Sequence, residues 1–196
     1  MRIMATINLD VLAVGNLVRD GSTIVEAHST STLIRTEDRN IVVDTSSKFL
    51  KPAVKDSLKQ LRVLPKDVDS VVFTHAHHDH IENADLFTKA KIYVRKEEEF
   101  GKGIQVDKDM ELCPGVKLIH TPGHTAGSMS VFVTAERKYA ITGDAVPLQD
   151  NVLKMVPPGL NIDKDLAMKS IKAIVSFADV IVPGHGFPFI NEKVLK

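Results

Sequence analysis

Four histidines and one aspartate fall within residues 74–80, directly after an apolar run that is typical of a buried strand. Residues 74–80 read THAHHDH, and residues 70–73 read SVVF. Imidazole and carboxylate groups are common ligands of divalent transition metals, and the end of a strand holds such groups rigidly. Because the stretch contains half of the chain's eight histidines, it favours a metal site over a solvated polar loop. We expect four of its side chains to face one point as the chain leaves the strand: His75, His77, Asp79 and His80.

Three more residues of the same ligand types occur later in the chain, each after an apolar run and beside a glycine. They are His124 after residues 116–119, Asp144 after residues 139–142, and His185 after residues 180–183. Glycine permits tight turns and a close approach of the backbone to an ion. Functional side chains are commonly placed on loops that a rigid scaffold positions. We therefore expect the ends of these strands to converge on one edge, together with the first cluster.

Alternation of apolar and polar residues predicts strands in the first quarter of the chain. We expect them at residues 7–14, 23–26, 31–35 and 40–43, with turns at residues 20–21 and 37–40. This pattern favours an antiparallel meander. Residues 52–61 then show helical spacing with a proline in the first turn, and Pro65 is expected to stop this helix.

The second half repeats this order of strands followed by a helix. Strands are expected at residues 91–94, 116–120, 128–133 and 139–142, and a helix around residues 167–178, whose apolar residues share one face. Two strand-rich halves, each flanked by a helix, favour an α+β fold with two sheets face to face and the helices outside. The chain has 196 residues, of which 43% are hydrophobic, and we expect a single domain over residues 1–196.

Charge and cysteine content favour a cytoplasmic protein that acts on a small molecule. The 25 basic and 25 acidic residues cancel, so net charge attracts the chain neither to nucleic acid nor to a membrane surface. The single cysteine, Cys113, cannot form an internal disulfide and is expected to be a buried structural thiol. Residues 1–4 resemble neither a signal peptide nor a membrane span. Nothing in the sequence specifies a homo-oligomeric state.

The order of these motifs resembles the metallo-β-lactamase superfamily. The matching motifs are His-x-His-x-Asp-His at residues 75–80, Thr-Pro-Gly-His-Thr at 121–125, Gly-Asp at 143–144 and Pro-Gly-His at 183–185. The resemblance extends over about residues 40–186 and implies a four-layer αββα sandwich with a two-metal site at its edge. It also implies a division of the ligands: His75, His77 and His124 for the first metal, Asp79, His80 and His185 for the second, and Asp144 as the bridge.

Further expectations follow from the same resemblance. Asp44 occupies the position of the family's Asp-Thr-Gly turn, and we expect it to orient a ligand imidazole. His28 lies in a segment that the resemblance places near the site, so it is a candidate for contacting the substrate. His78 and His120 are expected to be structural or exposed. Residues 81–87 lack the Gly-Gly pair of many family hydrolases, and this variant resembles the small single-domain members.

Two adjacent divalent ions can share one water, lower its pKa toward neutrality and stabilise an oxygen that gains charge in the transition state. We therefore expect a hydrolase that uses a metal-bridging hydroxide on a small ester, thioester or lactone, with Asp79 as the catalytic proton carrier. Zinc is the expected metal, and iron and manganese are the alternatives because histidine-rich sites accept several metals. Residues 145–160, which are rich in proline and apolar residues, form either a loop that contacts the substrate or part of the core.

Three other functions remain open within the same family. A phosphodiesterase or ribonuclease is less favoured, because the 40 residues between Asp144 and His185 are too few for an inserted domain in addition to the helix. An iron-dependent oxidoreductase that resembles the persulfide dioxygenases would share the framework and would consume oxygen. A non-catalytic scaffold is least favoured, because all seven ligand positions are filled.

Overall fold

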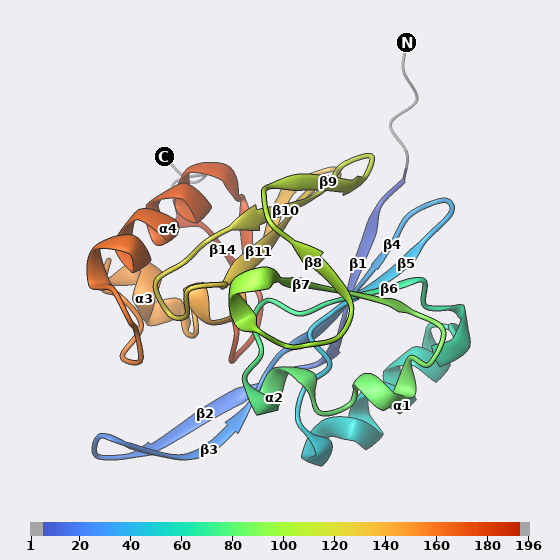
Figure 1. Ribbon diagram of the computed structural model, residues 1–196, viewed down its shortest axis with the longest axis horizontal. Helices are drawn as coiled ribbons and strands as arrows, with labels where there is room; N and C mark the ends of the chain where they lie inside the picture. Colours follow the sequence, from blue (N-terminus) through green and yellow to red (C-terminus); the bar gives the residue numbers. More distant parts are fainter. Residues whose placement is uncertain (1–5, 193–196) are drawn as a thin grey trace.

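The structure, a computed structural model, describes residues 6–192 and contains two six-stranded sheets and a separate hairpin (Figure 1). The prediction about residues 1–4 concerns a segment outside the described residues. No helix within residues 6–192 is long and apolar enough to cross a membrane.

The first sheet is antiparallel at one end and parallel at the other. Its strands, in spatial order, are β1 (Asn8–Ala13), β4 (Ser31–Arg35), β5 (Asn40–Val43), β6 (Ser70–Val72), β7 (Lys91–Arg95) and β8 (Ile104–Val106). The strands from β5 to β8 pair in parallel. The carboxyl ends of β5 and β6 therefore share one edge, where the segments that begin with Asp44 and Thr74 leave the sheet.

The second sheet places three strand ends at one edge in the same way. Its order is β14 (Phe189–Ile190), β13 (Val180–Val182), β12 (Lys138–Ile141), β11 (Met129–Thr134), β10 (Val116–His120) and β9 (Met110–Cys113). Strands β12 and β13 are parallel, and β10 has the direction of β12 because both are antiparallel to β11. His124, Asp144 and His185 follow the carboxyl ends of these three strands.

Helices cover the outer face of each sheet. The helices are α1 (Lys51–Gln60), α2 (His78–Ile81), α3 (Gln149–Leu153) and α4 (Lys164–Phe177), with short 3-10 helices η1 (Lys48–Leu50), η2 (Pro65–Asp67), η3 (Ala84–Leu86), η4 (Lys96–Glu98) and η5 (Gly143–Ala145).

Three buried clusters hold these layers together. One lies between the sheets and contains Ile34 and Leu118, the second joins Leu58 of α1 to the first sheet, and the third joins Ile171 of α4 to the second sheet. This arrangement confirms the αββα sandwich. The single domain over residues 1–196 stays a prediction.

The predicted antiparallel meander is wrong in its first part. Strands β2 (Asn16–Asp20) and β3 (Thr23–His28) form a hairpin that pairs with neither sheet, and β1 pairs directly with β4. The hairpin extends away from the two sheets at the lower left of Figure 1. Its side chains are mostly exposed, because neither face carries enough apolar surface to join the core between the sheets.

Smaller differences from the prediction have local causes. Helix α1 ends at Gln60 rather than at Pro65, because Arg62 adopts a φ of 58° that a helix cannot continue, and Pro65 instead begins η2. Residues 145–160 contain α3 and are not a continuous loop. Strands β2, β8, β9 and β14 were not predicted, because none of them shows an apolar run or an alternation strong enough to mark a strand. Cys113 is buried, as predicted.

Candidate metal centre

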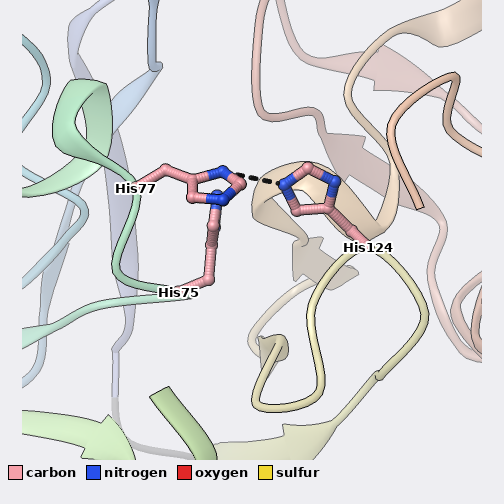
Figure 2. Close-up of side chains that lie close together, drawn as sticks. All are labelled: His75, His77 and His124. Carbon is pink, nitrogen blue, oxygen red and sulfur yellow. Dashed lines mark hydrogen bonds between the residues drawn. The ribbon is translucent and has the colours of Figure 1, made fainter. Parts of the chain in front are cut away.

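The ligand-type residues predicted from the sequence lie together where the carboxyl ends of strands from both sheets meet. Three groups within the described residues place one potential ligand atom per residue within 4.8 Å of the others: His75, His77 and His124; His75, His80 and Asp144; and Asp79, His80 and His185. Figure 2 shows the first group, in which His75 and His77 face His124. His75 and His77 lie in the loop that follows β6 in the chain, and His124 lies in the loop that follows β10. All seven predicted side chains therefore belong to one cluster.

Four atoms of this cluster are buried without a hydrogen-bond partner. They are Nε2 of His75, Nε2 of His80, Oδ2 of Asp79 and Oδ1 of Asp144, and only three other buried side-chain nitrogen or oxygen atoms in residues 6–192 share this condition. Buried polar atoms are nearly always hydrogen-bonded, because an unpaired one loses its hydration without compensation. Four unpartnered atoms that can donate electron pairs, all in one cluster, fit a divalent metal centre.

Backbone carbonyls fix the tautomers of two imidazoles in the cluster. His124 Nδ1 lies 2.8 Å from the carbonyl oxygen of Leu160, and His185 Nδ1 lies 2.8 Å from the carbonyl oxygen of His28. A carbonyl only accepts hydrogen bonds, so Nδ1 carries a proton and Nε2 is the atom left to bind a metal. Histidines that bind metals commonly use this arrangement.

Asp44 holds the loop behind β6 through three hydrogen bonds. Its Oδ1 accepts from the Thr74 N–H at 2.8 Å, and its Oδ2 accepts from the Thr74 hydroxyl and from His80 Nδ1, each at 2.7 Å. The Thr74 hydroxyl also lies 3.2 Å from His75 Nδ1. Burial disfavours a charge on His80, yet Asp44 raises the pKa of this imidazole well above its ordinary value. Asp44 has a φ of 52°, a left-handed conformation that aspartate adopts more readily than most residues other than glycine.

His77 is oriented differently from the other imidazoles. Its Nδ1, rather than its Nε2, lies 3.1 Å from His124 Nε2 (Figure 2). His77 is also exposed, whereas His75 and His124 are buried. It therefore completes the first group from the solvent side.

Asp144 lies between the two sets of residues that the resemblance assigns to separate metals. Its Oδ2 is 3.5 Å from His124 Nε2, and its Oδ1 is 3.2 Å from His185 Nε2 and 3.5 Å from His80 Nε2. Each oxygen thus faces a different set, which is the placement that a bridging carboxylate needs. Gly184 makes this possible, because a Cβ atom at residue 184 would lie 2.1 Å from Asp144 Oδ1.

The pKa shifts of three side chains fit metal ligands, whereas, against the effect of burial, Asp44 and Asp144 raise the pKa of His80 and of His185, each of which would have to lose a proton to bind a metal. Burial, followed by the neighbouring His80, lowers the pKa of His75 well below its ordinary value, and burial lowers the pKa of His77. Burial opposes the charge on Asp144, but His185 outweighs this effect and holds the pKa of Asp144 well below its ordinary value. His75 and His77 are therefore neutral and Asp144 is ionised at neutral pH, as metal binding requires.

Glu98, which was not predicted from the sequence, connects the loop that follows β6 to the loop that follows β10 through hydrogen bonds. Its Oε2 accepts a hydrogen bond of 2.8 Å from the Ala76 N–H, and its Oε1 accepts from the Gly127 N–H at 3.0 Å and the Thr125 hydroxyl at 2.5 Å. These loops carry the three histidines of the first group. Glu98 lies in the charged run 96–99, which has the composition of a solvated surface and gave no signal for this role.

A small cavity of about 80 Å³ opens onto the cluster. Its floor is formed by His77, Asp79, His124, Asp144 and His185, one wall by Leu17, Arg19, Ile24 and Ala27 of the β2–β3 hairpin, and the other by Pro147, Pro158, Gly159 and Leu160. Residues 145–160 divide between the two expected roles: Ala145 and Val146 are buried in the core cluster under α4, whereas Pro147 and residues 158–160 border the cavity. Their contact with a substrate stays a prediction.

The three remaining histidines contribute no ligand atom to the groups. His78 is exposed at the start of α2. His120 Nε2 lies 2.9 Å from the carbonyl oxygen of Ala126. His28 does not line the cavity, and its ring stacks on Phe49.

Comparisons with known proteins agree with this geometry. The profile of the metallo-beta-lactamase superfamily matches residues 25–103 and 102–185. The chain is 39% identical to a "Probable metallo-hydrolase" of Methanocaldococcus jannaschii over 198 residues, covering 98% of this chain and 94% of that protein. It is 30% identical to an N-acyl homoserine lactonase of a Bacillus species over 135 residues, covering 60% of this chain and 54% of that enzyme.

A solved structure shows the same fold. It is a metallo-beta-lactamase-type protein of Thermotoga maritima, which superposes with a TM-score of 0.79 at 23% identity, covering 94% of this chain and 99% of that one. The superfamily profile and the relative with 39% identity establish the family, and the solved structure shows the fold. This chain belongs to the metallo-beta-lactamase superfamily.

Proposed function

We propose that this protein is a metal-dependent hydrolase that binds two divalent ions, with zinc as the first choice of metal. The proposed reaction is the hydrolysis of a small ester, thioester or lactone. The observation that carries the proposal is the cluster of seven imidazole and carboxylate side chains with four unpartnered buried atoms. His75, His77 and His124 would hold one ion, Asp79, His80 and His185 the other, and Asp144 both. Two adjacent ions supply a strong Lewis acid and activate water at neutral pH.

The chain's own groups divide the remaining tasks. Asp144 sets the separation of the two ligand sets, and Asp44 and the Leu160 carbonyl hold two imidazoles in the required tautomer. Asp79 borders the cavity, and its side chain is 20% exposed. Its carboxylate is therefore placed to take a proton from the attacking water and return it to the leaving group.

The cavity supports a small substrate. Its volume is well below the ~300–1,000 Å³ of typical ligand pockets. Only the reacting group of a substrate therefore fits at the floor of the cavity, and the remainder of the molecule extends outward between the two walls. Those walls are largely apolar, with Leu17, Ile24 and Leu160 among their side chains, which favours an acyl group over a polynucleotide. The 30% identity to an N-acyl homoserine lactonase adds support for a lactone or a related ester. We also keep the expectation of a cytoplasmic enzyme.

Elemental analysis combined with a substrate panel tests this proposal. Protein reconstituted with zinc, iron or manganese is assayed on small esters, thioesters and lactones, and separately on small phosphodiesters and single-stranded RNA. Acyl hydrolysis that needs metal, and that falls by ~100-fold or more in Asp79→Asn when the rate is expressed per fully metal-loaded chain, is the expected result. RNA cleavage without acyl hydrolysis would replace the proposal with a nuclease, and oxygen uptake by the iron form on a persulfide would replace it with an oxidoreductase.

A further inference from the structure

The hairpin wall of the cavity carries a charge that the proposed reaction does not use. In the register of the hairpin, Leu17 pairs with Ala27 and Arg19 with Ile24, and these four residues line the cavity. Leu17 and Arg19 lie two residues apart and so share one face of their strand, and the register shift between Val18 and Arg19 brings Ile24 and Ala27 to the same side. This side of the hairpin borders the cavity over the metal cluster. Arg19 is the only lysine or arginine among the described residues that line the cavity.

The guanidinium of Arg19 has unused hydrogen-bond donors. A guanidinium has five N–H donors, whereas the hydrogen bond that this side chain forms is a long one of 3.5 Å from Nη1 to the Ser22 carbonyl. Within residues 6–192 it forms no ion pair with a carboxylate, although Arg35 and Arg95 each do. The two acids of the cavity, Asp79 and Asp144, lie instead among the histidines of the floor.

The opposite wall leaves space for this guanidinium. A Cβ atom at residue 159 would lie 3.3 Å from Arg19 Nη2, so Gly159 allows the guanidinium to sit close to the backbone across the mouth of the cavity. The Arg19 guanidinium and the ligand cluster therefore border the same cavity. A guanidinium binds two oxygens of one carboxylate or phosphate group through two parallel hydrogen bonds.

We infer that Arg19 is the anion-binding residue of this cavity and that the substrate is a small acyl compound that carries a carboxylate or phosphate group. This inference rests on the proposed function, because it assumes that the acyl group reacts at the floor. The formal net charge of the chain is zero, so preference for an anion comes from Arg19 and the bound metals rather than from the protein as a whole.

Matched ester substrates test the inference. Mono-4-nitrophenyl succinate, glutarate and adipate carry a terminal carboxylate at three distances from the ester, and 4-nitrophenyl butyrate has the same leaving group without the charge. The zinc-loaded enzyme is expected to hydrolyse the best of the three monoesters with a kcat/KM about tenfold above that of the butyrate. Arg19→Gln should lower kcat/KM for this monoester by about 10- to 100-fold and for the butyrate by less than threefold. Arg19→Lys should retain part of the preference.

Arg137→Gln is the matched control, because it removes the same charge from an exposed residue that does not line the cavity, and its kinetics should equal those of the wild type. An equal loss on charged and neutral esters in Arg19→Gln, or no preference in the wild type, would overturn the inference.

Calorimetry of the metal-loaded proteins with glutaramate, which carries a carboxylate, and with the neutral butyramide measures binding without turnover. If no ester is hydrolysed, the proposed function fails, whereas weaker glutaramate binding by Arg19→Gln still supports the anion site and unchanged binding refutes it.

Discussion

The ligand cluster at the floor of the cavity consists mostly of buried side chains that follow strand ends, whereas the walls consist of more exposed segments that leave the sheets. Within the ligand cluster, His75 and His80 are 0% exposed and His185 is 2% exposed. In the walls, Leu160 is 54% exposed and Arg19 of the hairpin is also exposed. The floor side chains are held by fixed hydrogen bonds, whereas the wall side chains have few partners.

This difference separates two functions of the molecule. A metal centre needs ligand atoms fixed to within a few tenths of an ångström, and buried loops tied to two sheets provide such positions. Substrate selection tolerates more movement, and exposed elements can vary without loss of the core. Changes to the floor side chains should therefore abolish metal binding and activity. Changes to the wall side chains should alter substrate preference alone, because the walls support the floor through backbone carbonyls.

Removal of the carboxylate between the two ligand sets should have the largest effect. In Asp144→Ala, the repulsion between two cations is no longer reduced, so the second metal should be lost preferentially and hydrolysis should fall by about three orders of magnitude or more. Elemental analysis after dialysis and initial rates measure this. Asp150→Ala, an exposed acid that pairs with Lys154 on the surface, is the control. Full activity with both metals retained would refute the bridging role.

His77 and His78 provide a contrast between adjacent residues of the same type. His77→Ala should remove the metal held by the first group and reduce the bound metal to about one equivalent. The reason is that the Nδ1 of His77 in the wild type faces His124 Nε2. His78→Ala should change metal content little, because His78 lies outside every ligand group. Equal metal loss in the two variants would show that the assignment of ligands is shifted by one residue.

A smaller effect is expected from Glu98, which supports the floor without belonging to it. Glu98→Gln keeps the size of the side chain but cannot accept all three hydrogen bonds, so metal affinity should fall by about 10- to 100-fold at the first group. Competition with a chromophoric chelator measures this loss. Glu99→Gln, at an exposed neighbouring position, should bind metal like the wild type. If the two variants behave alike, Glu98 does not position the ligands.

The floor could be predicted from the sequence because its ligand types are rare and concentrated. Histidines that follow apolar runs, with glycines beside them, already specify strand ends and metal chemistry. The same logic predicted the two sheets and the outer helices. These signals are local, and they survive in a single sequence.

The walls and the supporting contacts could not be predicted in this way, since they depend on tertiary placement. The alternation in residues 16–28 is the same whether a strand joins a sheet or leaves it, so the detached hairpin was not foreseen. Glu98 resembles any acid of a charged run until the fold brings it to the Ala76 and Gly127 N–H groups. The support that the Leu160 carbonyl gives to His124 has no side-chain signature at all.

The smallest effect should come from the wall itself. Leu17→Ala removes apolar contact area from the cavity and should lower kcat/KM by about tenfold at most for a substrate with an apolar acyl chain, with metal content unchanged. Val18→Ala, on the next residue of the same strand but not lining the cavity, should leave kcat/KM unchanged. Metal loss in Leu17→Ala would show that the hairpin supports the floor, contrary to the separation described above.

Anomalous diffraction from crystals of the zinc-loaded protein, recorded on both sides of the zinc absorption edge, tests the central claim most directly. We predict two zinc peaks per chain, one among His75, His77 and His124 and one among Asp79, His80 and His185, with the Asp144 carboxylate between them. A single peak under saturating zinc, or two peaks that do not share Asp144, would contradict the two-metal centre.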